Sequence, residues 1–298
     1  MTLARILFAT AMLGSVSVSI AGADAAYRQQ IEHWRQQRLQ ALTAPDGWLT
    51  LVAFEWLQPG AQTVGRAAGN AIVLPAGPAH LGTITLAADG RVRLDLAADS
   101  GATVDGEAVR SATLRDDRDP QPSVVRFGTT SLTLLDRSGR KALRVKDSTA
   151  TTRTAFRGLD YFPIDPSWRI DARFEPFVPV HHVELATEVG TVERYVVPGR
   201  IEFERDGQHV TLLPVIQTPG DTRLFVVFAD RTSGHETYGA ARFLYADAPR
   251  DGRVVLDFNR AYNPPCAFTA FATCPLPPPE NRLPLRVTAG ELKYRGEH

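Results

Sequence analysis

Short runs of alternating or β-branched residues fill most of the chain and constrain its fold more than any other feature. Gly, Pro, Asp and Asn separate these runs at spacings typical of β-sandwiches and barrels. In chain order they include TITLA, RVRLDL, SLTLLD, RYVVPG, HVTLLPVI, RLFVVF and RVVLDF. The sequence therefore predicts a mainly β fold built from antiparallel sheets.

One stretch near the N-terminus has helical periodicity instead. Between Ala25 and Thr43, the apolar residues Tyr27, Ile31 and Trp34 recur at i, i+4 and i+7, with Arg and Gln on the other faces. The turn residues APDG then predict the end of the helix. We expect an N-terminal helix within residues 26–47 that docks on its own domain by this apolar stripe.

Residues 1–25 have the order of a secretory signal peptide. A positive charge at Arg5 precedes an apolar run from Ile6 to Leu13, and small residues lead to the A-x-A motif that ends at Ala25. The alternative is a membrane anchor, but Gly and Ser interrupt the apolar stretch and leave it short of a spanning helix. We expect cleavage before Ala26 and a periplasmic or secreted protein.

Charge and composition exclude several other classes of protein. Basic and acidic residues balance at 33 each and form no basic stripe, so nucleic acid is not an expected partner. An apolar content of 44% is ample for a core. No segment after the signal sequence is long and apolar enough to predict an integral membrane span.

A polar Thr/Ser stretch from Lys146 to Phe156 separates two groups of predicted strands. About 270 residues would remain after cleavage, which suits one large or two ordinary domains. We therefore expect a β-sandwich over residues 48–150. A second antiparallel β domain, either a barrel or a sandwich, is expected over residues 151–298.

Residues of the first β region recur in a characteristic order between Val64 and Asp136. They are Gly65-Arg66, Asn70, Ile72, Leu74, His80, Gly101, Asp105-Gly106 and Phe127-Gly128. This order resembles the forkhead-associated (FHA) sandwich, which binds phosphothreonine through an arginine, a serine and an asparagine. Only Arg66 matches, because Gly77 and Ser100 occupy the other two positions. Phosphate recognition needs several converging donors, so the sequence favours a scaffold sandwich that does not read phosphopeptides.

Polar residues follow two apolar strands of the second β region. The strands are Leu224 to Phe228 and Val254 to Phe258, and such strand ends commonly support sites. The predicted small-ligand site consists of Asp230, Thr232, Tyr238, Arg242, Asp257, Asn259, Tyr262 and Asn263. Arg242 would anchor an anion, and Asp230 or Asp257 would act as the catalytic base of a hydrolytic reaction. In the structural alternative, Asp230 caps a turn and Arg242 pairs with Asp257 in a buried ion pair. Asn259 and Asn263 would then satisfy carbonyls of the Pro-rich loop.

The segment from Asp257 to Pro284 is too rich in proline for a helix or an interior strand, and it contains both cysteines, Cys266 and Cys274. In an exported protein two cysteines favour one disulfide, which we predict here. A nucleophilic Cys266 with His235 or His182 as base is the open alternative.

Other chemistries find less support in the sequence. G-x-S-x-G, H-E-x-x-H and P-loop motifs do not occur, and the cysteine and histidine spacing does not suit zinc, so we expect neither metal nor cofactor. Paired carboxylates of a glycosidase, drawn from Asp230, Asp257 and Glu280, stay open because sequence spacing does not give their separation.

Three long segments carry a second resemblance. They are DGWLTLVAFEWLQPG, FADRTSGHETYGAARFL and VVLDFNRAYNPPCAFTAFATCPLPPPENRLPLRVTAGEL. They resemble the bacterial family catalogued as domain of unknown function 1684 (DUF1684), over a span from Trp34 to Leu292. The resemblance implies no particular activity. The chain departs from the family pattern after Glu291, where a lysine is expected and the next lysine is Lys293.

Two hypotheses of function therefore stand. The first is an exported protein with a small-ligand site in the C-terminal β domain, with hydrolysis as its candidate reaction. The second is a non-catalytic binding or scaffold protein of the cell envelope, in which the polar residues hold loops together. The partner would be a small molecule in the first case and an envelope component in the second.

Overall fold

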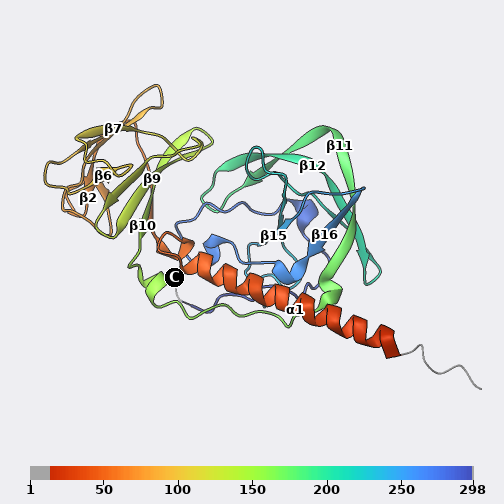
Figure 1. Cartoon of the computed structure of the whole chain (residues 1–298). Helices are drawn as coiled ribbons and strands as arrows, with labels where there is room; N and C mark the ends of the chain where they lie inside the picture. Colours follow the sequence, from red (N-terminus) through yellow and green to blue (C-terminus); the bar gives the residue numbers. More distant parts are fainter. Residues whose placement is uncertain (1–13, 297–298) are drawn as a thin grey trace, which may run out of the picture.

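The computed structural model describes residues 14–296, with side chains from residue 22 onward. The chain is mainly β with one long N-terminal helix, as predicted, and its sheets are antiparallel apart from one short parallel pair in the sandwich. Figure 1 shows two β regions, with the long helix α1 running along the C-terminal one. No described helix is both long and apolar enough to cross a membrane.

The N-terminal β region is a sandwich of two five-stranded sheets. One sheet has the order β1 (Leu51–Trp56), β10 (Arg140–Asp147), β9 (Thr130–Arg137), β8 (Val124–Phe127) and β6 (Thr103–Val104). The other has the order β3 (Ile72–Val73), β2 (Gly60–Gly65), β4 (Gly82–Leu86), β5 (Val92–Leu96) and β7 (Ser111–Leu114). In β5 the apolar residues are buried while Arg93 and Asp95 point outward, which is the alternation expected when one face of a sheet packs on a core.

The C-terminal β region consists of two open sheets with a main core and a second buried apolar cluster that includes Phe225, Val227 and Phe243. A four-stranded sheet has the order β13 (Gln208–Leu212), β12 (Val192–Arg205), β11 (Arg169–Ala186) and β16 (Arg253–Asp257). A two-stranded sheet joins β14 (Leu224–Phe228) to β15 (Arg242–Ala246). Apolar residues from both sheets share the core. Of the two predicted alternatives the barrel is wrong, because the described strands do not close on themselves.

Helix α1 (Gly14–Thr43) docks on the C-terminal region by the predicted stripe. Ile31 and Leu42 are fully buried and the Gln positions between them are exposed, whereas the side chains of Arg35 and Arg38 are only 14% and 13% exposed. The helix ends where the turn residues predict, but it begins at Gly14 and not at Ala25. Residues 1–13 lie outside the described part of the chain, so the signal peptide predicted for residues 1–25 stays a prediction.

Short helical turns complete the fold. They are η1 (Trp48–Thr50), α2 (Thr151–Thr154), η2 (Pro166–Trp168), η3 (Phe258–Arg260), η4 (Pro265–Ala267) and η5 (Pro279–Asn281). The last three lie in the Pro-rich segment, which is irregular as predicted. Phe268, Leu283 and Leu285 are buried there, so side-chain packing holds a segment that has few ladder hydrogen bonds.

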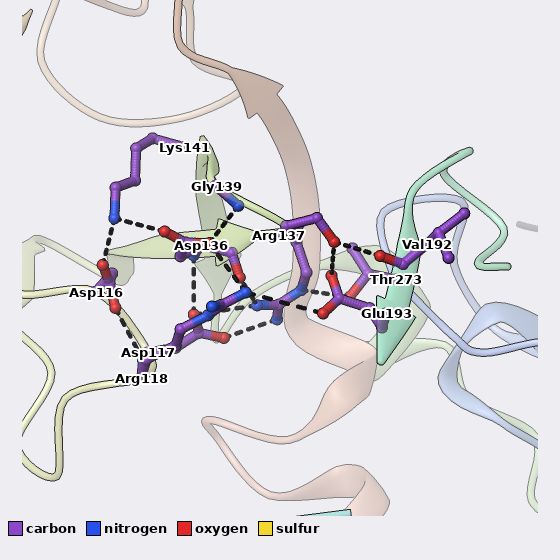
Figure 2. A network of polar contacts seen from close by, with 11 residues as sticks. Asp116, Asp117, Arg118, Asp136, Arg137, Gly139, Lys141, Val192, Glu193 and Thr273 are labelled. Carbon is purple, nitrogen blue, oxygen red and sulfur yellow. Dashed lines mark hydrogen bonds and ion pairs between the residues drawn. The ribbon is translucent and has the colours of Figure 1, made fainter. Parts of the chain in front are cut away.

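A polar network joins the two β regions at the hairpin between β9 and β10 (Figure 2). Arg137 pairs with Asp117 at 2.7 Å, and its Nε donates to Thr273 Oγ1 at 3.3 Å across the junction. Arg118 lies 3.0 Å from Asp136 and 3.9 Å from Glu193 on β12. The two regions are therefore held together by charged groups as well as by packing.

Candidate functional site

Asp230 and Arg242 form a fully buried ion pair. Arg242 Nη2 lies 2.5 Å from Asp230 Oδ2, and the two side chains are 1% and 0% exposed. Arg242 also donates to the carbonyl oxygens of Ala289 at 2.5 Å and Val287 at 3.0 Å. Burial lowers the pKa of Arg242, and the Asp230 carboxylate opposes that shift. The structural alternative expected a buried ion pair at Arg242, but it named Asp257 as the partner, and the structure shows Asp230 instead.

The remaining oxygen of Asp230 caps the turn that follows β14. Thr232 donates to Oδ1 from its backbone N at 2.7 Å and from Oγ1 at 2.5 Å. Thr232 also bonds Thr237 through the two hydroxyls at 2.9 Å. Tyr238, another predicted ligand residue, donates to the carbonyl of Cys266 at 3.2 Å. Both carboxylate oxygens of Asp230 are therefore occupied by protein donors.

Asp257 and Asn259 hold helix α1 against the end of β16. The Tyr27 hydroxyl donates to Asp257 Oδ1 at 2.8 Å. The amide of Asn259 donates to the Tyr27 oxygen at 2.9 Å and to Asp165 O at 2.8 Å, while its Oδ1 accepts from Asp165 N at 3.0 Å. Asn259 is fully buried, so this network fixes three segments that are distant in sequence.

Asn263 and Tyr262 lie beside a second anchor of α1. Glu291 is fully buried and accepts from Arg38 Nε at 2.9 Å and from the backbone N of Asn263 at 2.8 Å. The Arg38 guanidinium also lies 4.6 Å from the centre of the Tyr262 ring. Burial alone would lower the pKa of Arg38, but Glu291 outweighs it and the pKa is raised. Among the described residues, Asn263 Oδ1 is buried without a hydrogen-bond partner.

Cys266 and Cys274 are free and buried, so the predicted disulfide is not formed in the structure. Cys266 donates from its backbone N to Cys274 Sγ at 3.2 Å, and its own Sγ lies 3.5 Å from Ala272 O. Burial strongly raises the pKa of the Cys274 thiol, which keeps it protonated. His182 and His235, the bases considered for a nucleophilic Cys266, are exposed while the cysteine is buried.

The structure thus divides the eight predicted ligand and catalytic residues among three buried networks. Sequence reasoning missed Arg38 and Glu291, which belong to the network of Asn263, and it missed a further buried polar residue, Asn281. Asn281 is buried and exchanges hydrogen bonds with Leu213 at 2.7 and 3.0 Å while donating to Val227 O at 2.8 Å, so it substitutes for a strand partner. Glu280, the third candidate carboxylate, is exposed.

A cleft of about 330 Å³ lies at one end of the sandwich, between the β8–β9 turn, the end of β10 and the loop after α1. Its walls carry Arg126, Lys146, the acid Asp46, and Ser and Thr hydroxyls. In the sheet register Arg126 faces Ser131, and Ser131 faces Lys146. The three side chains therefore stand in a row on the outer face of the sheet, about 5 Å apart at Cβ.

The electrostatics of this row differ from those of the buried networks. Within the described residues, no ion pair or hydrogen bond engages the Arg126 guanidinium, which is exposed. Lys146 Nζ donates to Asp46 O at 2.5 Å and lies 5.6 Å from the centre of the Trp48 ring. Burial, and then the neighbouring Arg144, lower the pKa of Lys146. Two cations with donors to spare are the chemistry of an oxyanion site.

A second cavity of the sandwich, about 420 Å³, contains more charge but fewer unpaired groups. Lys141 contacts Asp116 at 2.5 Å and Asp136 at 2.8 Å, as Figure 2 shows. Arg91 pairs with Asp89 at 2.7 Å. These pairs neutralise one another, so the first cleft is the stronger candidate.

Comparison with known proteins gives a family but no activity. Residues 154–292 match the family described as "Protein of unknown function (DUF1684)". The solution NMR structure of an uncharacterized protein from Haloarcula marismortui is 36% identical in sequence, covers 47% of this chain and 78% of its own, and superposes with a TM-score of 0.40. No curated protein matches the chain.

Proposed function

Because residues 154–292 belong to the DUF1684 family, whose description assigns no reaction, function has to be argued from the geometry, and we propose a non-catalytic binding protein. Its ligand is a small molecule that carries an oxyanion, such as a phosphate, sulfate or carboxylate. The cleft of the sandwich holds that group, and the C-terminal β region serves as the scaffold.

The row Arg126–Ser131–Lys146 is the observation that carries the proposal. A guanidinium fork, a hydroxyl and an ammonium on adjacent strands can donate to one oxyanion together. Rigid strands fix their spacing, so little side-chain freedom has to be lost on binding. Asp46 also lines the cleft, and its carboxylate would disfavour a ligand that places a second negative charge beside it.

The C-terminal residues suit a catalytic role less well. A general base must have a lone pair within reach of a substrate proton. Both oxygens of Asp230 accept hydrogen bonds, from Arg242 and Thr232. Asp257 accepts from Tyr27 and Asn259 through Oδ1, and its Oδ2 lies 3.5 Å from Arg260. The hydrolytic site therefore stays a prediction, and the proposal follows the non-catalytic alternative.

Export to the cell envelope is part of the same proposal and is supported only by the predicted signal peptide. Intact-mass measurement of protein recovered from the envelope fraction of a bacterial host tests it. We expect a mass that corresponds to a chain beginning at Ala26. Full-length protein confined to the cytoplasm would contradict export, but it would leave the proposed ligand site in the cleft unaffected.

A thermal-shift titration tests the cleft. Inorganic phosphate, sulfate and succinate serve as probes, at constant ionic strength, with the wild type, Arg126→Met and the control Arg110→Met. Arg110 is exposed on the same β region but outside the cleft, so both variants lose one charge. We expect at least one probe to raise the melting temperature of the wild type and of Arg110→Met, with Arg126→Met much less affected. Equal shifts in both variants would show that bulk charge, not the cleft, is responsible.

A further inference from the structure

Arg144 is a largely buried cation that lacks an anionic partner among the described residues. It lies on β10 two residues before Lys146, opposite Thr133 on β9 and Phe54 on β1. Its Nε is buried without a hydrogen-bond partner. The guanidinium carbon lies over the Trp48 ring, 5.1 Å from its centre. Among the described residues, this cation–π contact is the one interaction of the guanidinium with a charged, polar or aromatic group.

Two other buried arginines show what such a group normally has. Arg38 lies 2.9 Å from Glu291, and Arg242 lies 2.5 Å from Asp230. A buried cation without such a partner is strongly disfavoured, because its desolvation is not offset. A stacked aromatic ring offsets only part of that cost.

The groups around Arg144 do not supply the missing charge. Arg137 is a second guanidinium on the same outer face of the sheet, and it engages the nearby Asp117 at 2.7 Å. From the C-terminal β region, the loop between Cys266 and Cys274 contacts Arg137 through Thr273 Oγ1 at 3.3 Å, and its two cysteines are buried thiols. Lys146 adds a further positive charge. Burial, and then Arg137, lower the pKa of Arg144 to about 10.

At the junction of the two β regions, Arg144 therefore has the cations Arg137 and Lys146 as neighbours, and the nearby carboxylate, Asp117, is paired with Arg137. We propose that Arg144 binds a small oxyanion between the sandwich and the loop that runs from Cys266 to Cys274, with the Thr133 hydroxyl as a second donor. A carboxylate matches the planar guanidinium fork. This site is separate from the cleft, and its existence does not depend on the proposed function.

Binding there would join the two β regions, because Arg144 belongs to the sandwich and the loop to the C-terminal region. The bound anion adds to the junction formed by Arg137, Thr273 and the β9–β10 hairpin in Figure 2. A ligand that binds only the native state stabilises it in proportion to its occupancy. The site should therefore make thermal stability depend on the identity of the anion, beyond its ionic strength.

The test compares the melting temperature in acetate with the melting temperature in chloride at equal ionic strength. The protein is the full chain carrying Arg126→Met and Lys146→Met, which removes the cleft, with and without Arg144→Met or Arg144→Lys. With Arg144 present, we expect acetate to raise the melting temperature saturably by about 2–4 °C. Arg144→Met should abolish the rise, and Arg144→Lys should keep part of it.

A second readout separates binding from a general loss of structure. In chloride, Arg144→Met should melt no lower than its parent, because it removes an uncompensated buried charge. Acetate should also slow hydrogen exchange in the loop between Cys266 and Cys274 only when residue 144 is basic. The proposal is overturned if acetate acts equally on Arg144→Met, or gives no saturable rise at all. It is also overturned if Arg144→Met melts well below its parent while Arg144→Lys matches it in chloride, since Arg144 would then be a structural cation.

Discussion

The C-terminal β region and the outer face of the sandwich use similar polar side chains for different ends. In the C-terminal region, Asp230 and Arg242 are buried against each other at 2.5 Å, and their other donors and acceptors meet the backbone. On the sandwich, Arg126 and Lys146 stand in one row. Among the described residues the Arg126 guanidinium has no hydrogen-bond partner, and Lys146 Nζ donates to Asp46 O alone, which leaves donors on both side chains for a ligand. Polar groups that satisfy one another hold a fold together, whereas unpaired ones beside a cleft are available to a ligand.

The largest expected effect comes from breaking the buried pair. Asp230→Ala leaves Arg242 charged and buried and also removes the cap of Thr232. We expect the free energy of unfolding to fall by about 3–5 kcal/mol in urea titrations. Asp247→Ala, an exposed control, should change it by less than about 0.5 kcal/mol.

A double variant shows whether the uncompensated charge is the cause. Asp230→Ala with Arg242→Met should recover much of the lost stability, because both charges are then gone. If Asp230→Ala unfolds like the exposed control, then the pair does not hold the C-terminal region, and Asp230 becomes available again as a catalytic candidate.

Helix α1 gives the next effect. Glu291→Gln weakens the charge-assisted bonds from Arg38 and Asn263, and we expect a loss of about 1.5–3 kcal/mol. Hydrogen exchange along the helix should accelerate around Arg38. Glu32→Gln is the matched control, because Glu32 is 57% exposed and pairs only with Arg35 on the same helix. Equal behaviour of the two variants would mean that Glu291 does not anchor α1.

On the sandwich the corresponding changes should affect binding and leave stability nearly intact. Lys146→Met removes one charge-assisted donor from the cleft, so we expect affinity for the best oxyanion probe to fall roughly tenfold to 100-fold. Isothermal titration measures this loss, and urea unfolding should show only a small change. A large loss of stability with unchanged affinity would reverse the comparison.

The pH dependence should be the smallest effect. Burial lowers the pKa of Lys146 below its ordinary value of 10.5. Between those two pKa values the unfolded chain binds more protons than the native one, so the free energy of unfolding should rise with pH. Oxyanion affinity should fall over the same interval, because the native ammonium loses its proton. Lys146→Met should lack both trends, and a wild type whose affinity is flat up to pH 10.5 would contradict the assignment.

Much of the fold followed from periodicity, and the exceptions have local reasons. The stripe of Tyr27, Ile31 and Trp34 predicted the docking face of α1, and alternation predicted strands such as β5. Periodicity could not distinguish a barrel from open sheets, because closure depends on which edge strands pair. The missing disulfide shows that the spacing of Cys266 and Cys274 predicts proximity and not a bond.

The candidate site was less predictable. The strand-end rule found Asp230, Arg242 and Asn259, but it could not say whether these groups bind one another or a ligand. Arg38 and Glu291, which bond each other and Asn263, are separated by most of the chain, so sequence spacing gave no signal for them. Arg126 and Lys146 gave no clear signal either, because Lys146 begins the polar stretch predicted to separate the two groups of strands. Only the antiparallel register of β8, β9 and β10 brings them together across Ser131.

The most direct test compares variants of the two regions in one binding experiment. Isothermal titration with the best oxyanion probe compares the wild type, the cleft variant Arg126→Met with Lys146→Met, and Asp257→Asn, a near-isosteric change in the C-terminal region. We predict no detectable binding by the cleft variant and wild-type affinity for Asp257→Asn. Binding retained by the cleft variant and lost in Asp257→Asn would contradict the account and return the site to the C-terminal region.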